Sequence, residues 1–202
     1  MDFDTRMNHL LQELSQVHWD LLVLSETWRE QRQESFTLDE WGHKWFGSGG
    51  TPHERGIGFL LTKRWTQTRF KPTSERTASL DVKIAKGTHL RIIGVYMPHT
   101  GYSDVAVEEV YAELDHERES AHVAGHCTII VGDMNAQIGP QTELDDPKII
   151  GNNPASSRNS RGALMLEWCT MRGMVVANSF GMTHFDEIWT YTNSGKSKQL
   201  DY

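Results

Sequence analysis

Asp133 and Asn135 are the two residues of this sequence whose types and spacing are best suited to chemistry. They follow a strand-forming run at residues 128–131, and Gly132 lets the backbone turn where that strand ends. Two residues apart in an extended segment, their side chains point to the same side. A carboxylate can orient or deprotonate water, and a neighbouring amide can donate a hydrogen bond to a phosphate oxygen. The same pair also suits a turn that only ends a strand, so this motif alone leaves both interpretations open.

Three further predicted strands deliver polar side chains at their ends. Glu26 follows one apolar run, Tyr96 and His99 close a second, and Asp201 closes a hairpin predicted at residues 188–201. Taken singly, each has an ordinary structural interpretation. An acid after a strand is usually solvated or caps a helix, and a tyrosine there usually packs. The order of the elements must therefore decide.

The coarse order of elements predicts a layered sheet fold. The helices are predicted at residues 5–16, 103 to about 123, and about 162 to 172. The strands are predicted near residues 20–25, 43–47, 56–62, 79–84, 90–96, 127–131 and 174–178, ahead of the final hairpin. Residues 138–161, rich in Gly, Pro, Asn and Ser, are long for a connection, and a disordered surface excursion is favoured over a substrate-recognition loop.

In this order, the segments resemble the endonuclease/exonuclease/phosphatase superfamily, which includes abasic-site endonucleases, DNase I-like nucleases and the endonuclease domains of non-LTR retrotransposons. The resemblance covers nearly the whole chain. The motifs that carry it are Leu-Ser-Glu-Thr at 24–27, Gly-Ile-Gly-Phe-Leu at 56–60, Val-Tyr-Met-Pro at 95–98, Gly-Asp-Met-Asn at 132–135, and Trp-Thr-Tyr at 189–191 with Leu-Asp-Tyr at 200–202. Residues 159–169 and 173–179 look particularly like the retroelement branch and its domesticated relatives.

This resemblance implies a catalytic set for phosphodiester hydrolysis. Glu26 would hold Mg²⁺, with Mn²⁺ as a possible substitute, and Mg²⁺ commonly binds through one or two carboxylates plus substrate phosphate and water. Asp133 would orient or deprotonate the attacking water, and Asn135 would hydrogen-bond the phosphate. Tyr96 would help to stabilise the phosphoryl group, and Asp201 would orient the family's catalytic histidine.

The resemblance also implies substrate contacts and a fold. The substrate-binding residues would be His99, Trp189, Lys196 and Lys198, the last two in a loop that the family turns toward substrate. The fold would be an α/β (α+β) class, four-layer α/β/β/α sandwich of the DNase I-like type, with residues 1–202 as one domain. We expect it to be incomplete at both ends, because the family's first strand and its C-terminal Ser-Asp-His strand have no counterpart in the sequence. For the same reason we expect the 202-residue chain to be weakly active or inactive.

Composition fits one α/β core, since 202 residues with 38% hydrophobic content can bury a sizeable interior. We expect an intracellular protein of the nucleus or cytoplasm, not secreted and without a membrane partner, because no apolar stretch could cross a bilayer and residues 1–4 lack a signal-peptide layout. The two cysteines, Cys127 and Cys169, are predicted to be reduced core residues.

Charge argues against a DNA partner, because 20 basic residues face 27 acidic ones and the net charge is −7. Further domains of a longer polyprotein could lend affinity, and local basic groups also exist. These groups are Arg64, Arg69 and Lys71, then Arg158 and Arg161, then Lys196 and Lys198.

Four hypotheses remain open. The leading one is a Mg²⁺-dependent DNA endonuclease domain derived from a retroelement. The others are a phosphatase or phosphodiesterase for a small phosphate ester, a non-catalytic scaffold, and a truncated fragment. A zinc site at His116, His122, His126 and Cys127 is disfavoured, because Gly125 is predicted to end the helix that would align the ligands.

Overall fold

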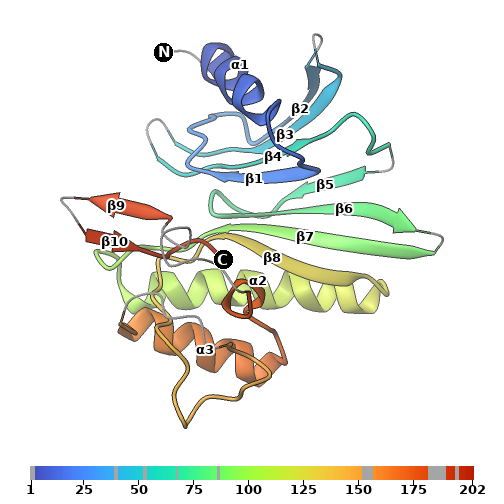
Figure 1. Ribbon diagram of the computed structural model, residues 1–202. Coiled ribbons are helices and arrows are strands. Elements are labelled where there is room, and N and C mark those ends of the chain that lie inside the picture. Colours follow the sequence, from blue (N-terminus) through green and yellow to red (C-terminus); the bar gives the residue numbers. More distant parts are fainter. Residues whose placement is uncertain are drawn as a thin grey trace.

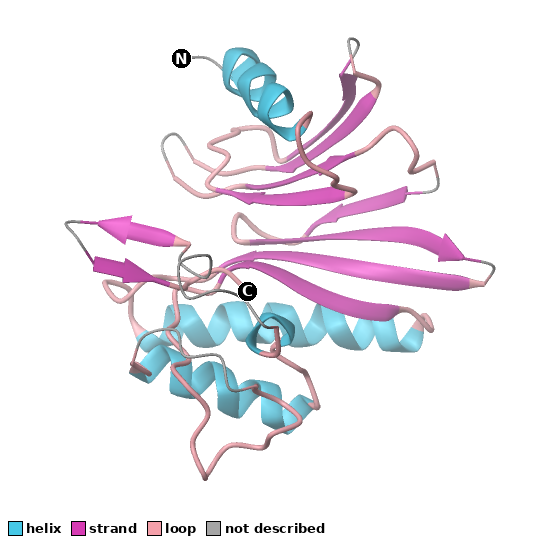
Figure 2. Cartoon of the chain, viewed as in Figure 1, coloured by secondary structure: helices cyan, strands magenta, loops and turns pink. Residues whose placement is uncertain are grey.

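Two four-stranded sheets packed face to face form the centre of the structure, and helices cover both outer faces (Figures 1 and 2). The computed structural model describes residues 3–38, 41–51, 54–66, 68–85, 87–151, 157–181, 190–193 and 196–202. The predicted four-layer α/β/β/α sandwich is confirmed.

The first sheet has the strand order β1-β4-β3-β2 and is antiparallel throughout. Its strands are β1 (Leu21–Ser25), β2 (Gln33–Leu38), β3 (His43–Ser48) and β4 (Ile57–Leu61). Helix α1 (Phe3–Leu14) lies on its outer face, where Met7 and Leu11 pack against Trp45 and Leu60. Gly58 is required in β4, because a Cβ there would lie 2.1 Å from the Trp45 ring.

The second sheet has the order β5-β6-β7-β8 and mixes antiparallel with parallel pairing. Its strands are β5 (Thr68–Pro72), β6 (Thr77–Ala85), β7 (Thr88–Tyr96) and β8 (Cys127–Asp133). Strands β7 and β8 are parallel and are joined by α2 (Asp104–Val123), which with α3 (Ser160–Arg172) covers the outer face. The Ser103 hydroxyl caps α2 and the Asn159 side chain caps α3.

Three apolar cores hold the layers together. The core between the sheets is built on alternate residues of β4 and β6, such as Phe59 and Leu80. The core under α2 and α3 is the largest and includes Leu114 and Trp168. No helix within the described ranges is long and apolar enough to cross a bilayer.

Most predicted elements are confirmed to within a few residues, but three differ. Strands β2 and β5 were not predicted. The strand predicted near residues 174–178 is wrong, because the Val176 N–H donates to Ile149 O and a 3-10 helix, η1 (Ala177–Ser179), follows. The predicted hairpin is present as β9 (Tyr191–Asn193) and β10 (Lys196–Lys198).

The long connection after Ile138 is not a disordered excursion where the structure describes it. Ile138, Ile149 and Ile150 are buried in the core under α2 and α3. Arg158 donates to both carboxylate oxygens of Asp145, at 2.8 and 2.7 Å, and so closes the loop. The described part of this connection is therefore fixed by the buried isoleucines and by the bidentate ion pair.

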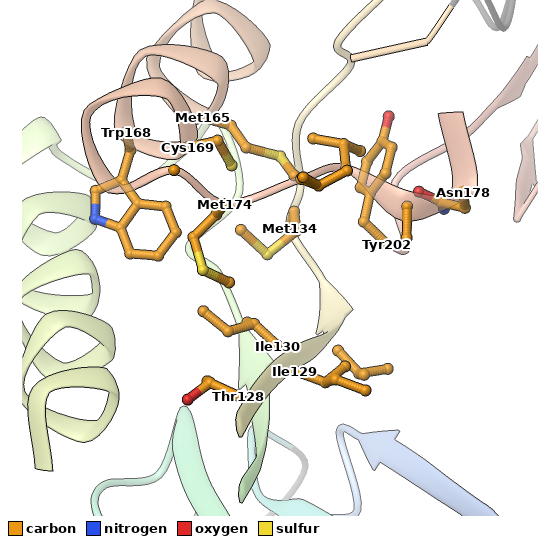
Figure 3. A pocket seen from close by; sticks show the side chains of 15 residues that line it. Thr128, Ile129, Ile130, Met134, Met165, Trp168, Cys169, Met174, Asn178 and Tyr202 are labelled. Carbon is orange, nitrogen blue, oxygen red and sulfur yellow. The ribbon is translucent and has the colours of Figure 1, made fainter. Parts of the chain in front are cut away.

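An apolar groove of about 470 Å³ lies between β8 and the segment leading from α3 to η1 (Figure 3). It exists because residues 174–176 do not pair with β8. The side chains labelled in Figure 3 are Thr128, Ile129, Ile130, Met134, Met165, Trp168, Cys169, Met174, Asn178 and Tyr202. Cys169 is thus a buried free thiol, whereas Cys127 is a free thiol that is exposed, contrary to prediction.

The side chain of Glu117 joins α2 to the second sheet. This fully buried carboxylate accepts hydrogen bonds from Lys71, Thr73 and Ser79, at 2.7, 2.9 and 2.9 Å. Burial acts to raise the pKa of Glu117, but these hydrogen bonds outweigh it and the pKa lies below its ordinary value. The ionised carboxylate therefore adds stability above the unfolded pKa, and this stability is lost as the pH falls.

We expect Glu117→Gln to lower the free energy of unfolding at pH 7 by about 3 kcal/mol, because it leaves Lys71 and Arg91 without their buried counter-charge. Urea denaturation measures the effect, and the deficit should shrink as the pH falls. The matched control is Glu119→Gln on the exposed side of the same helix. Equal losses in the two variants would contradict the assignment.

Candidate functional site

Three of the predicted site residues lie in one row across the second sheet. Tyr96 of β7 is paired with Asp133 of β8, and Asp133 forms an isolated antiparallel bridge with Asp201. Residues paired across neighbouring strands lie on the same face of a sheet, about 5 Å apart. Because Tyr96 packs against the core between the sheets, this row faces the first sheet.

Glu26 reaches this row from the first sheet. It follows β1 with a φ of 54°, a left-handed conformation that is costly for a residue with a Cβ. The backbone just after Glu26 is held by a hydrogen bond from the Thr27 N–H to Gly56 O, at 3.3 Å. The Tyr96 hydroxyl donates a hydrogen bond to Glu26 Oε1 and so links the two sheets at the site.

Asn135 holds Asp133 in place. Its backbone N–H donates to Asp133 Oδ1 at 2.8 Å, and its Nδ2 donates to Met97 O at 2.8 Å and to Asp133 Oδ2 at 3.3 Å. Asn135 has a φ of 46°, which asparagine tolerates better than most residues. Both amide protons are engaged, so a bond to phosphate would require Nδ2 to leave one of these acceptors.

Asp133 and Tyr96 both have raised pKa values. Burial, and then the negative charges of Asp201 and Glu26, raise the pKa of Asp133 to about 6, although the backbone N–H of Asn135 acts in the opposite direction. Burial, followed by the hydrogen bond to Glu26, also raises the pKa of Tyr96 above its ordinary value. Tyr96 is therefore a neutral hydrogen-bond donor at any physiological pH.

The predicted substrate contacts are placed unequally. His99 lines a hollow of about 190 Å³ together with Glu26 and Tyr96. Lys198 lies on β10, whose hairpin projects beyond the ends of β7 and β8 (Figure 1). Trp189 and the side chain of Lys196 are outside the described residues. Within the described residues, no imidazole hydrogen-bonds Asp201.

Three residues that were not predicted complete the walls of the site: Arg55, Arg76 and Tyr102. Arg55 and Tyr102 line the same hollow as Glu26. The Arg76 guanidinium lies 5.1 Å from the Tyr96 ring centroid and donates from Nη1 to Tyr96 O at 3.2 Å. Hydrogen bonds with Glu75 and then with Tyr102 raise the pKa of Arg55. Of the three, only Tyr102 is close in the sequence to a predicted site residue, six residues after Tyr96.

The donor set fits a hard divalent cation. Glu26, Asp133 and Asp201 supply oxygen atoms, and their mutual repulsion, visible in the raised pKa of Asp133, would be relieved by a positive ion. Within the described residues, no group of three His, Cys, Asp or Glu side chains is arranged to hold a metal ion by itself.

One of the histidines considered for zinc, His126, lies against other side chains. His126 stacks on His89 with ring centroids 5.1 Å apart, and its Nδ1 lies 3.5 Å from Asp81 Oδ1. The predicted basic groups are mostly paired with acids as well: Lys71 with Glu117, and Arg161 with Asp104 at 2.9 Å. Arg64 is paired with Asp20.

Comparison with known proteins gives a family match over the full length. The model of the Endonuclease/Exonuclease/phosphatase family matches residues 1–202. Craniofacial development protein 2 from Bos taurus is 24% identical over 98% of this chain, and that from Tragulus javanicus is 23% identical over 98%. The chain spans about a third of the length of these two relatives, 33% and 34%.

A solved structure shares the fold. The 3'-5' exonuclease (NExo) from Neisseria meningitidis superimposes with a TM-score of 0.50 and 19% identity, covering 68% of this chain and 56% of the exonuclease chain. At this identity the likeness extends to the fold alone.

The raised pKa of Asp133 predicts how its removal changes stability with pH. A folded pKa of about 6, above the ordinary 3.8, means that the stability contributed by Asp133 is present below pH 3.8 and lost as the pH rises through 6. An Asp133→Asn variant does not lose stability in this way, because the amide does not titrate. We expect the Tm of the variant minus the Tm of the unsubstituted chain, both measured by circular dichroism, to increase between pH 4 and pH 7. A difference that stays constant with pH would contradict the assignment.

Proposed function

Because the chain belongs to the Endonuclease/Exonuclease/phosphatase family, we propose that it is a metal-dependent phosphodiesterase whose substrate is DNA. The observation that carries the proposal is the convergence of Glu26 with the row formed by Tyr96, Asp133 and Asp201. These groups come from opposite sheets and four separate segments of the chain. A turn that only ends a strand would not bring such groups together. Hydrolysis of a phosphodiester needs a base for water and donors for the phosphate oxygens, and Asp133 and Tyr96 have the chemistry for these two roles.

Asp133 is the base in this proposal. With a pKa of about 6, its carboxylate is ionised at pH 7 to 8 and yet more basic than an ordinary aspartate. Its two oxygens are held by Asn135, so a water molecule would be received in a fixed position. Burial raises the pKa of Asp133 most, and the charge of Asp201, next to it in the row, raises it further.

Tyr96 and Glu26 serve the phosphate side. The Tyr96 hydroxyl stays protonated, and on substrate binding it can turn its proton from Glu26 to a non-bridging oxygen. Its release frees Glu26 to hold Mg²⁺ or Mn²⁺, which when bound would neutralise the charge that develops on the phosphoryl group. Asn135 would bind phosphate directly only by giving up its bond to Met97 O or its longer bond to Asp133 Oδ2.

A small phosphate ester is the second candidate substrate. The net charge of −7 and the pairing of Lys71, Arg158 and Arg161 with carboxylates favour it, because DNA binding by counterion release needs free cations. The size of the craniofacial development proteins leaves room for other segments that could supply such affinity.

We also propose an origin and a location for this activity. The likeness of residues 159–179 to retroelement endonucleases supports descent from a retroelement, with DNA as the inherited substrate. A DNA substrate, in turn, supports an intracellular site of action in the nucleus or cytoplasm.

The test is plasmid nicking with Mg²⁺ and with EDTA, on the 202-residue chain and on a longer form that includes the flanking reading frame. We expect metal-dependent nicking that Asp133→Asn lowers at least about 100-fold, because the base is lost. Asp146→Asn, an exposed loop substitution that keeps an acceptor for the Lys148 N–H, is the control. If neither form nicks DNA but a small phosphodiester is hydrolysed, the second candidate replaces the first. No hydrolysis of either substrate would indicate a non-catalytic scaffold.

We expect a substitution of Glu26 to weaken Mg²⁺ binding much more than DNA binding. Glu26→Gln should weaken Mg²⁺ binding, measured by calorimetry, by at least about tenfold, while DNA binding changes little. Glu54→Gln removes the same charge from the same hollow and should leave Mg²⁺ binding nearly unchanged. Equal losses of Mg²⁺ and DNA affinity in the Glu26 variant would mean that Glu26 is structural.

A further inference from the structure

Strained backbone points to a residue outside the proposed catalytic set. Among the described residues other than glycine, four have a positive φ: Glu26, Trp28, Arg55 and Asn135, at 54°, 56°, 60° and 46°. Such conformations cost of the order of 1–3 kcal/mol and tend to cluster at functional sites. Two of the four are already in the site. The other two are joined to each other, because the Trp28 N–H donates to Arg55 O at 3.1 Å.

The Arg55 side chain lies in the hollow beside Glu26 and Tyr96. Its Nη1 is 2.5 Å from Glu75 Oε2, which fixes one side of the guanidinium. Its Nε is buried and has no hydrogen-bond acceptor within the described residues. The nearest carboxylate oxygen to Nε, on Glu54, is 3.7 Å away and beyond hydrogen-bond distance. The charge of Arg55 is thus paired with Glu75, and what Arg55 brings to the edge of the site is an unused donor at Nε.

Tyr102 faces the same hollow and is held from several directions. The Arg76 guanidinium lies 4.7 Å from its ring centroid, and the His99 ring meets it edge-on at 4.7 Å. Its N–H donates to His99 O at 3.0 Å, and its carbonyl accepts from Arg161 Nη2 at 3.2 Å. Arg76 also contacts Tyr96, so it fixes the distance between the two tyrosine rings. The result is a rigid, partly exposed aromatic ring next to the phosphate chemistry.

A fixed aromatic ring suits a nucleobase better than it suits other parts of a phosphodiester. Every base has a π-face, and stacking on an aromatic side chain tolerates any base sequence. The base must be unpaired and unstacked from its neighbours to reach the ring. Stacking also suits an acidic protein, since it needs none of the free cations that this chain lacks at Lys71, Arg158 and Arg161.

We propose that the hollow between Tyr102 and Arg55 is a nucleoside subsite for single-stranded DNA. Tyr102 stacks on the base next to the scissile phosphate, and Arg55 donates from Nε to the adjoining sugar-phosphate. Arg76 is a positioning residue that keeps the Tyr102 and Tyr96 rings in place. This inference rests on the proposed nuclease function and names the form of its substrate.

The test compares two fluorescent probes of twelve nucleotides, one a single strand of mixed bases and the other an abasic backbone of the same length. Affinities are measured by anisotropy with Mg²⁺ in the Asp133→Asn background, so that hydrolysis does not consume the probe. We expect the base-bearing strand to bind about 5- to 100-fold more tightly. Tyr102→Ala should bring this ratio close to one, whereas Tyr102→Phe should keep most of it because the ring remains.

Arg69→Ala is a control at a surface site away from the hollow and should leave the ratio unchanged. Arg69 is exposed on β5, and its row of the sheet lies several residues from the row that contains Tyr96. Equal binding of both probes by the Asp133→Asn protein would overturn the proposal, and so would a Tyr102→Ala variant that keeps the ratio. Loss in Tyr102→Phe as large as in Tyr102→Ala would overturn the stacking role.

The two proposals can fail separately. Metal-dependent plasmid nicking by the unsubstituted chain, together with equal binding of the two probes, would leave the nuclease function standing and remove the subsite. A base-dependent ratio that needs the Tyr102 ring, in a protein that nicks no DNA, would support the subsite and remove the catalytic proposal.

Discussion

The parallel pairing of β7 with β8 is the interaction on which the candidate site depends. It places Tyr96 opposite Asp133, and the Asp133–Asp201 bridge extends the same row. A slip of one residue would turn each of these side chains to the opposite face of the sheet. Gly132 makes the close pairing possible at φ 148°, since a Cβ there would lie 2.0 Å from Val95 O. The glycine before the acid is therefore a requirement of packing as well as of a turn.

The site is assembled at a cost to stability that the surrounding structure must offset. Glu26 and Asn135 have left-handed backbones, and Asp133 is half-buried beside the carboxylates of Glu26 and Asp201. Glycine at the left-handed positions, or a neutral side chain at Asp133, would remove these costs. All of these features nevertheless occur together where the two sheets adjoin. Elsewhere the fold follows the usual rules: Glu117, the most deeply buried acid, is paired and hydrogen-bonded. Asp133 and Glu117 thus differ in the direction of their pKa shifts: the pKa of Asp133 is raised, as is common at functional sites, and that of Glu117 is lowered by its hydrogen-bond donors.

Much of the fold could be predicted because its strands are apolar and end at recognisable residues. Strand β2 has exposed side chains at four of its six positions, and β5 carries Arg69 and Lys71 and ends at Pro72, so neither shows an apolar run. The strand predicted near residues 174–178 failed because Val176 bonds to Ile149, 27 residues earlier, which no local pattern reveals. The same limit applies to Arg55 and Arg76, which reach Tyr96 only through the pairing of distant segments.

The apolar groove is not where the polar side chains of the candidate site lie, and the alternation of β8 explains why. Ile130 packs toward α2 and α3, whereas Val131 packs between the sheets. Asp133 is two residues beyond Val131 and therefore faces the first sheet, away from the apolar groove in Figure 3. That groove is lined by methionine, isoleucine, valine and tryptophan and contains no carboxylate. The smaller hollow, with Glu26, Arg55, Tyr96 and Tyr102, offers charged groups, hydrogen-bond donors and an aromatic ring, and through Tyr96 it adjoins the row that contains Asp133.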